Sequence, residues 1–263
     1  MKSGFFKVDR YDVSTSEGTI SLPILYYDVS VFQAFFLVDR ERAEEKLRGT
    51  GLRPVLLGGR AFAGLAFFEY RQTSIGPYNE VGTVLAVYPD RESSQPKTLF
   101  DILRPSAERK NGFHILDLPV TTAGACAAGR ELWGFPKFVT DIPLTFEGRR
   151  FSGSVLDPDR RTPILTLDGR YGRGPRLPGI DLVLYSLRSE EMLRTVVTTD
   201  SRMTTSTGRG LALTLGDSDH PMARNLRDLE LDGRRPIVVQ NAEYFRSRLP
   251  AGEPITATAL RRT

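Results

Sequence analysis

One lysine of the sequence lies in a run of bulky apolar residues. The segment from Gly129 to Val139 reads GRELWGFPKFV, so Lys137 has a tryptophan, two phenylalanines and a proline as close neighbours. Lysine is normally a surface residue, because burying an ammonium ion without a partner is costly. Desolvation disfavours the charged form, so a lysine held among rings is expected to have a lowered pKa and to be partly the free amine. A free amine attacks a ketone to form an imine, which is a recognised mode of covalent catalysis.

Lysine is scarce elsewhere in the chain. Of the 36 basic residues, six are lysines and the rest are arginines. A chain that uses arginine for ordinary surface charge has little reason to place a lysine at an apolar position, and a guanidinium cannot form an imine because it stays protonated. The alternative interpretation is a lysine whose stem lies along the apolar patch while its ammonium group reaches water.

The same segment resembles the active-site segment of acetoacetate decarboxylase and its superfamily, in which a GRE-x3-[YF]-P-K pattern carries the Schiff-base lysine. The matching residues are Gly129, Arg130, Glu131, Phe135, Pro136 and Lys137. The stretch Tyr78 to Gly82 (YNEVG) resembles the family's Y-T-E-S-G segment, which supplies an active-site glutamate, here Glu80. The stretch Asp219 to Ala223 (DHPMA) resembles its D-H-A-M-A segment. The three segments follow the family's order and extend over roughly residues 20 to 240.

Three positions depart from the family's pattern. A second lysine directly follows the catalytic lysine of the decarboxylase, and Phe138 stands at that position here. The family's substrate-side arginine falls on Val29, and a second acidic residue of the pocket falls on Leu65. Without the second lysine, burial alone would have to lower the pKa of the Lys137 amine. The pocket would suit a larger or more apolar acyl chain than that of acetoacetate.

The resemblance implies roles for individual residues. Lys137 would be the nucleophile, and Glu80 would be a proton shuttle or an electrostatic gate beside it. Without the resemblance, Glu80 reads better as a solvated turn residue, because it follows Gly76 and Pro77. Guanidinium groups bind carboxylates through two parallel hydrogen bonds, so an arginine could clamp the substrate. The residues expected at the substrate are Trp133, Phe135, Phe138, Val29, Leu65, Arg71 and Arg130.

The expected activity is that of a Schiff-base lyase, in which an imine with Lys137 serves as the electron sink for decarboxylation of a β-keto acid. Two alternatives stay open. An aldolase, dehydratase or cyclase would use the same lysine on pyruvate or another 2-oxo acid. A non-catalytic protein of the same fold would keep the pocket and hold a small molecule without reacting with it. The resemblance requires no cofactor, and it implies a homo-oligomer.

Composition excludes several other classes of protein. The chain has 263 residues, of which 40% are hydrophobic and 26% charged, as in a soluble globular protein. Its net charge of +4 comes from scattered arginines, so no nucleic-acid partner is expected, and small organic anions such as keto acids suit the charge. One cysteine and two histidines make an intrachain disulfide impossible and a metal site unexpected. The N-terminal residues carry no signal peptide and no run is long enough for a membrane helix, so we expect a cytoplasmic protein without a membrane partner.

The elements that would position the site read mostly as strands. Strand-like composition marks residues 20–38, 61–71, 83–88, 113–120, 142–146, 150–156, 162–167, 182–187 and 209–215. Helices are predicted at 39–47, with Asp39 as the N-cap, at 123–132, with Gly134 just beyond, and at 220–229. Residues 90–112 read as a polar excursion, 170–180 as a loop, and 190–197 as a helix or a strand. Short strands at this spacing favour antiparallel sheets. We predict one β-rich α+β domain over residues 1–263, and the resemblance implies a strongly curved antiparallel sheet with a cone or barrel-like core and a few short helices.

Overall fold

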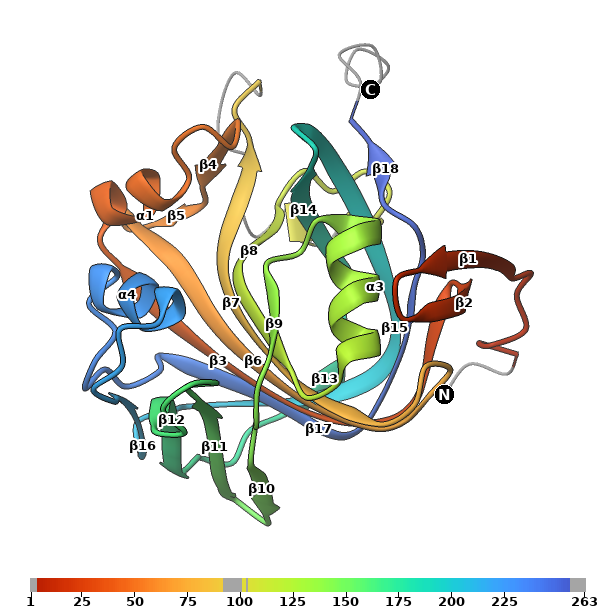
Figure 1. The fold of residues 1–263 in the computed structure, drawn as a ribbon. Coiled ribbons are helices and arrows are strands. Elements are labelled where there is room, and N and C mark those ends of the chain that lie inside the picture. The colour runs from red at the N-terminus through yellow and green to blue at the C-terminus, as the bar shows by residue number, and fades with distance from the viewer. Residues whose placement is uncertain (1–3, 92–100, 103, 256–263) are drawn as a thin grey trace.

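The computed structural model describes residues 4–91, 101, 102 and 104–255 (Figure 1). Of the polar excursion expected at 90–112, residues 92–100 and 103 lie outside that part. The helices are α1 (Arg40–Lys46), α3 (Ala123–Trp133) and α4 (Pro221–Asp228). The strands of the first half are β1 (Tyr11–Thr15), β2 (Gly18–Leu22), β3 (Ile24–Val38), β4 (Leu52–Pro54), β5 (Leu56–Leu57), β6 (Arg60–Thr73), β7 (Tyr78–Pro89) and β8 (Gly112–Val120). Those of the second half are β9 (Lys137–Val139), β10 (Leu144–Glu147), β11 (Arg150–Leu156), β12 (Pro163–Arg170), β13 (Arg176–Pro178), β14 (Leu182–Arg188), β15 (Glu191–Ser206), β16 (Leu211–Leu215), β17 (Val238–Leu249) and β18 (Glu253–Pro254).

The main sheet closes on itself. Its strand order is β4-β7-β6-β3-β17-β15-β14-β8-β9, and β7 also pairs with β8. The seven strands from β7 round to β8 therefore form a closed barrel. Neighbours in it are antiparallel except for β14 with β8, and β9 adds to β8 in parallel. The parallel addition follows from α3, because a parallel pair needs a crossover connection and this helix joins β8 to β9. The β-rich α+β fold with a barrel-like core is confirmed.

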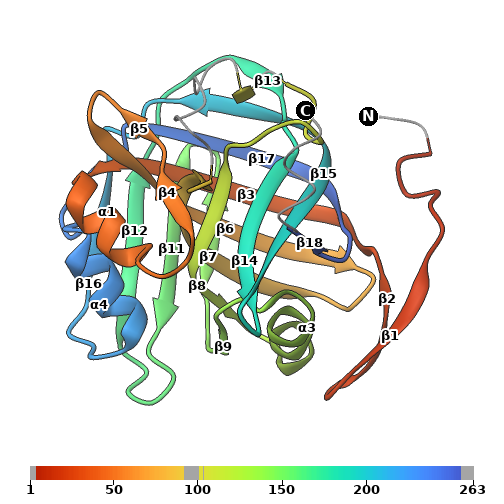
Figure 2. The ribbon, with the colours of Figure 1, turned by 90° about the horizontal axis from the view of Figure 1, so that it is seen from above.

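The smaller elements lie at two ends of the barrel. A second sheet has the order β10-β11-β12-β16, and the hairpin of β1 and β2 forms a sheet of its own. Figures 1 and 2 show α1 and α4 side by side at one end, whereas α3 and the β1–β2 hairpin lie toward the other. Among the described residues, no helix is both long and apolar enough to cross a membrane.

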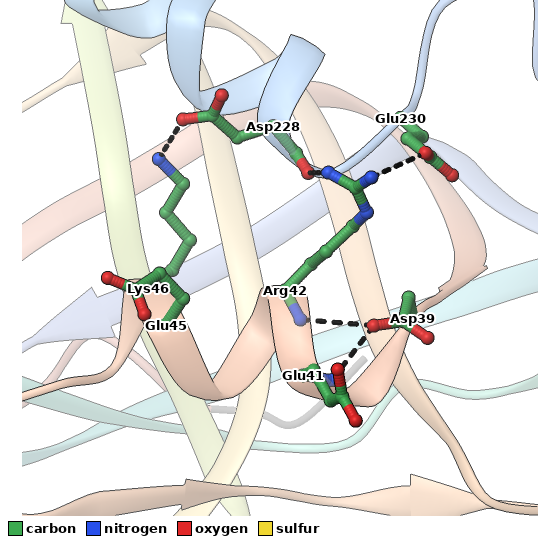
Figure 3. A pocket seen from close by; sticks show the side chains of 7 residues that line it. All are labelled: Asp39, Glu41, Arg42, Glu45, Lys46, Asp228 and Glu230. Carbon is green, nitrogen blue, oxygen red and sulfur yellow. Dashed lines mark hydrogen bonds and ion pairs between the residues drawn. The ribbon is translucent and has the colours of Figure 1, made fainter.

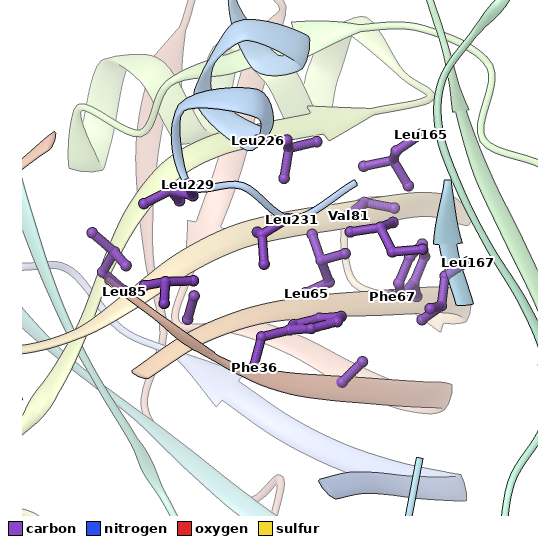
Figure 4. Close-up of a cluster of buried hydrophobic side chains, with 14 of the residues drawn as sticks. Phe36, Leu65, Phe67, Val81, Leu85, Leu165, Leu167, Leu226, Leu229 and Leu231 are labelled. Atoms are coloured by element: carbon purple, nitrogen blue, oxygen red, sulfur yellow. The ribbon is translucent and has the colours of Figure 1, made fainter. Parts of the chain in front are cut away.

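Two hydrophobic cores occupy the two faces of the main sheet. The α4 core packs against the second sheet and α4, and Figure 4 labels Phe36, Leu65, Phe67, Val81, Leu85, Leu165, Leu167, Leu226, Leu229 and Leu231 from it. The α3 core packs against α3 and includes Tyr26, Val29, Phe68, Tyr70, Tyr78, Leu118, Trp133 and Phe135. Successive residues of a strand point to opposite faces, so Phe67 joins the α4 core and Phe68 the α3 core. Each fully buried side chain of this size contributes about 1.5–3 kcal/mol.

Two of the helices begin at a capping side chain. The Asp39 carboxylate accepts hydrogen bonds from the backbone N–H groups of Glu41 and Arg42, so α1 begins where predicted. His220 caps α4 through Nδ1, which accepts from the N–H of Met222 at 3.2 Å.

Of the two alternatives for residues 190–197, the strand is the one observed, because the long strand β15 begins at Glu191. Other strand segments differ from the predicted pattern: part of the predicted loop at 170–180 is the short strand β13. The β1–β2 hairpin and β17 were not predicted. Polar and charged residues interrupt their apolar alternation, because much of each strand is exposed or half-buried.

A charged network joins α1 to α4 around a hollow of about 750 Å³ (Figure 3). Arg42 pairs with Glu230 at 2.7 Å, and Lys46 pairs with Asp228 at 2.6 Å. Lys46 Nζ also donates to Asn225 Oδ1 at 2.9 Å. Both basic groups that line this hollow therefore already have anionic partners, and it offers no amine for chemistry.

Asp117 on β8 extends this network into the protein and predicts a pH-dependent stability. It is 5% exposed and accepts from Asn225 Nδ2 at 3.0 and 3.2 Å, and burial raises its pKa from 3.8 to about 6. The folded state therefore binds more protons than the unfolded state between these values, so stability falls as the pH rises through this window, by about 3 kcal/mol in all. Asp117→Asn removes the buried charge and keeps the shape. Urea unfolding should show it more stable than wild type by about 1–3 kcal/mol at neutral pH and nearly unchanged near pH 4. The exposed Asp168→Asn is the control, and equal stability of Asp117→Asn and wild type at neutral pH would contradict the prediction.

Candidate active site

The end of α3 delivers Lys137 to the sheet. Gly134 follows the helix with φ 67°, and its N–H donates to the carbonyl of Arg130, as in an αL cap, while the N–H of Phe135 donates to the carbonyl of Gly129. A side chain at Gly134 would lie 2.1 Å from the carbonyl oxygen of Leu187, so glycine is required there for space as well as for conformation. The chain then reverses into β9, which pairs with β8 and starts at Lys137.

The reversal folds the lysine back over its own helix. A Cβ atom at Gly129 would lie 2.3 Å from Lys137 Cε and 2.4 Å from Cδ. The first glycine of the segment therefore leaves the room in which the lysine stem lies, between α3 and the sheet. Leu118 is the register partner of Lys137 on β8, so the side chain extends across β8 toward β7.

Glu80 on β7 meets the amine. Lys137 Nζ donates to Glu80 Oε2 at 2.6 Å, and the two side chains are 7% and 10% exposed. The glutamate is a strand residue, opposite Phe68 on β6 and Val120 on β8, and not a turn residue. Tyr70 donates to Glu80 Oε1 at 3.2 Å, so each carboxylate oxygen has a donor. The pair that the resemblance implied is thus formed in the structure, away from water.

Three buried tyrosines surround this ion pair. The rings of Tyr26 and Tyr78 both lie 4.6 Å from the ring of Tyr70, centroid to centroid, and the hydroxyls of Tyr26 and Tyr78 are 3.2 Å apart. Burial, together with the nearby Glu80 charge, raises the pKa of all three phenols above the usual value. The phenols therefore stay protonated at neutral pH and can donate hydrogen bonds. Lys137 Nζ also lies 5.8 Å from the centre of the Tyr78 ring.

A small apolar cavity lies beside Lys137. Its volume is about 10 Å³, which is room for about one water molecule. Its lining residues are Ile24, Tyr26, Ile75, Tyr78, Ala125, Ala128, Gly129, Trp133, Phe135, Lys137 and Leu249. Trp133 Nε1 donates to the carbonyl of Pro250 at 3.0 Å, so the indole is fixed between the cavity and the chain that leaves β17. A substrate larger than water needs these walls to move apart.

Four of the expected residues come together here. Lys137, Trp133 and Phe135 line the cavity, and Glu80 is paired to the lysine. Val29 is fully buried in the α3 core but does not line the cavity. The Trp133 and Phe135 rings stack with centroids 5.9 Å apart, so one aromatic wall faces the amine.

The other four expected residues lie away from this cavity. Phe138 follows Lys137 along β9, so it points to the opposite face and packs 4.3 Å from the ring of His220. Leu65 lies in the α4 core on the far face of β6. Arg71 follows Tyr70 and points away from the site for the same reason, pairing with Asp28 at 2.6 Å. Arg130 is on the exposed side of α3.

Some site residues were missed by the sequence analysis. Tyr78 belongs to the YNEVG segment and lies two residues before Glu80, and strand alternation could have placed both on one face. Tyr26 and Tyr70 carry no comparable signal, because they sit in ordinary strand sequence. Glu131 was part of the matching segment, yet it faces the β1–β2 hairpin, where it accepts from the Ser16 N–H at 3.1 Å.

A metal site does not form in the described ranges, where no three His, Cys, Asp or Glu side chains lie together in a way that could hold an ion.

The fold is a closed β-barrel, and its candidate site is a buried lysine that lines a small cavity and pairs with a buried glutamate. Residues 12–217 match the acetoacetate decarboxylase (ADC) family, and the chain belongs to that family. Family membership and the similar structures support lysine imine chemistry and an enzyme of the lyase type.

Solved structures share the fold at low sequence identity. The acetoacetate decarboxylase of Legionella pneumophila superposes with a TM-score of 0.65 at 15% identity, covering 95% of this chain and 92% of the other. The enduracididine biosynthesis enzyme MppR, complexed with pyruvate, gives 0.67 at 14% identity, covering 95% and 99%. An acetoacetate decarboxylase-like enzyme from Sphingomonas wittichii RW1 gives 0.61 at 11% identity, covering 89% and 93%. None of the curated proteins matches the sequence.

Proposed function

We propose that this protein is a Schiff-base lyase that decarboxylates a β-keto acid through an imine with Lys137. The observation that carries the proposal is the setting of Lys137, which lines a cavity together with Trp133 and Phe135 and whose Nζ lies 2.6 Å from the Glu80 carboxylate. Transfer of one proton from Nζ to Glu80 Oε2 along this hydrogen bond leaves a neutral amine that can attack a carbonyl.

The reaction balances with water and one proton. Nζ adds to the ketone carbon, and the carbinolamine loses its oxygen as water to give an iminium ion. The bond to the carboxylate carbon then breaks, its electron pair moves into the iminium to form an enamine, and carbon dioxide leaves. Protonation of the enamine carbon and hydrolysis by one water molecule release the ketone and restore the amine. Glu80 supplies and accepts the protons of these steps, because it is the carboxyl group in contact with the reacting nitrogen.

The apolar walls favour the loss of carbon dioxide. A carboxylate that enters this cavity loses most of its water shell, and its charge is dispersed as the carbon–carbon bond breaks. The same walls favour a substrate with an apolar acyl chain.

A second candidate is an aldolase or dehydratase on a 2-oxo acid. MppR structures contain pyruvate and the condensation product of pyruvate with imidazole 4-carboxaldehyde. An enamine formed from pyruvate on Lys137 would add to the aldehyde carbon in the same way. The amine and the carboxyl group have the same roles in both reactions, so the outcome depends on which substrate the cavity accepts.

Borohydride trapping tests the proposal directly. The protein is incubated with a panel of ketones and β-keto acids, reduced, and analysed by intact mass and by peptide mass. The expected result is one covalent adduct on the peptide that contains Lys137, together with carbon dioxide release from at least one β-keto acid. A conjugated chromophore from pyruvate plus an aldehyde, with no gas release, would favour the second candidate. The lack of any adduct would exclude both and leave non-covalent binding.

Gly129→Ala is expected to slow adduct formation by about 100-fold, because the new methyl group displaces the lysine stem and a shift of about 1 Å is enough for such a loss. Alanine is the better helix former, so the helix itself should not weaken. The measurement is the rate of borohydride-trapped adduct with butanone. Gly124→Ala is the matched control, since a Cβ there meets nothing within 4 Å on the same helix. Trapping of Gly129→Ala at the wild-type rate would show that the close contact is not required.

A further inference from the structure

The hydroxyls of Tyr26 and Tyr78 are the polar groups of the cavity lining that the mechanism leaves unused. They lie 3.2 Å apart, and in the described part of the chain they make no other hydrogen bond. Two hydroxyls contain two donor protons, and one bond between them uses one. One buried O–H therefore has no acceptor, although such groups are almost always satisfied in native proteins.

The cavity also has no free cation among the described residues that line it. Its one basic side chain is Lys137, which is paired with Glu80 and is consumed when the imine forms. Val29 stands where the family's arginine falls, and Arg71 and Arg130 point elsewhere. A substrate carboxylate in this cavity must therefore be bound by neutral donors.

We propose that the Tyr26–Tyr78 hydroxyl pair binds the carboxylate of the substrate in place of an arginine. The proposal rests on the proposed function for one point only, that the substrate occupies this cavity. Each hydroxyl rotates its proton toward the ligand, so the pair offers two donors to the two carboxylate oxygens. The substrate class is thus a monocarboxylate with a carbonyl carbon at Lys137 and an apolar tail against Ile24 and Leu249.

The protonation of both phenols supports this assignment. Burial raises the pKa of Tyr26 and of Tyr78, so neither becomes a phenolate that would repel an anion at neutral pH. Neutral donors also hold a carboxylate less tightly than a guanidinium does. Weaker ground-state binding is an advantage in a decarboxylase, because interactions that stabilise the reactant carboxylate and are lost with carbon dioxide raise the barrier.

Equilibrium binding of butyrate tests the pair without any covalent step. Calorimetry is performed on wild type, Tyr26→Phe, Tyr78→Phe and the double variant, each with butyrate and with the uncharged butyramide. Each single change is expected to weaken butyrate binding by about tenfold or more, since a hydrogen bond to a charged group is lost. Butyramide binding should change by less than about threefold. Tyr171→Phe is the matched control, because this tyrosine is buried in the α4 core and donates to the carbonyl of Gly148 at 2.8 Å.

Three results would overturn the proposal: unchanged butyrate affinity in the double variant, an equal loss for butyramide, or no preference of the wild type for butyrate. Trapping with butanone in the same variants separates the two proposals. Butanone has no carboxylate, so its adduct on Lys137 should survive both tyrosine changes. Suppose that the wild type forms no butanone adduct, and that the tyrosine variants bind butyrate more weakly than the wild type, as expected. The lyase proposal then fails and the carboxylate site stands.

Discussion

Lys137→Arg is expected to abolish the trapped ketone adduct and to lower turnover of any substrate by at least about 1,000-fold. Arginine keeps the positive charge opposite Glu80 and fills a similar volume, but its guanidinium stays protonated and cannot form an imine. The ion pair that crosses β8 can re-form, so the fold should persist. Intact mass after borohydride reduction and a turnover assay measure the two effects, and circular dichroism checks the fold.

Lys46→Arg is the matched control for this change. Lys46 is also a largely buried lysine, 17% exposed, that pairs with an aspartate at 2.6 Å. If burial and ion pairing alone made a lysine reactive, Lys46 would be trapped as well. It lies in the polar network between α1 and α4 and has no apolar cavity beside it, so its replacement should leave the adduct intact. An adduct that survives Lys137→Arg would place the chemistry on another residue.

The short segment around Lys137 could be understood from the sequence because its residues act locally. Gly129 leaves space, Gly134 ends α3 in a left-handed conformation, and Lys137 follows in the next strand. Each of these requirements depends on residues only a few positions away. The apolar setting of the lysine was therefore predictable, and its buried position agrees with it.

The composition of the rest of the cavity could not be read in the same way, because it depends on register between distant strands. Lys137 and Phe138 are adjacent in an extended segment, and so are Tyr70 and Arg71. Only one residue of each pair can face the cavity, and the sequence alone did not show that Phe138 and Arg71 would point to the other face. Leu65 was placed by counting along the chain, but β6 presents Phe68 opposite Glu80 and turns Leu65 to the other face.

The electrostatics of the amine also depend on tertiary structure. The sequence indicated that burial would act on Lys137 alone, since Phe138 replaces a second lysine. The resemblance also set Glu80 beside the lysine, and the structure places this carboxylate 2.6 Å from Nζ, on a strand 57 residues earlier in the chain. The two groups therefore form one hydrogen-bonded pair, and a single proton can move along that bond.

Glu80→Gln is expected to lower turnover by about 100- to 10,000-fold while leaving the trapped adduct in place. The change therefore separates proton transfer by the carboxyl group from the reactivity of the amine. Glutamine keeps the shape and can still bond to Tyr70, but it cannot carry a proton between steps. Lys137 keeps its place among the apolar side chains of the cavity, so attack on a ketone remains possible during a long incubation. Dehydration of the carbinolamine and protonation of the enamine lose their acid, and these steps become slow.

The readout is the ratio of two measurements on the same protein, the adduct yield after long incubation with butanone and the rate of carbon dioxide release from a β-keto acid. Glu69→Gln is the control, because Glu69 lies on β6 beside the site but pairs with Arg71 at 2.9 Å on the other face. It should change neither quantity. If Glu80→Gln released carbon dioxide at the wild-type rate, the carboxylate would be only a counterion. If it lost adduct and turnover equally with the fold intact, Glu80 would be needed to hold the lysine in position, and its role as a proton carrier would be refuted.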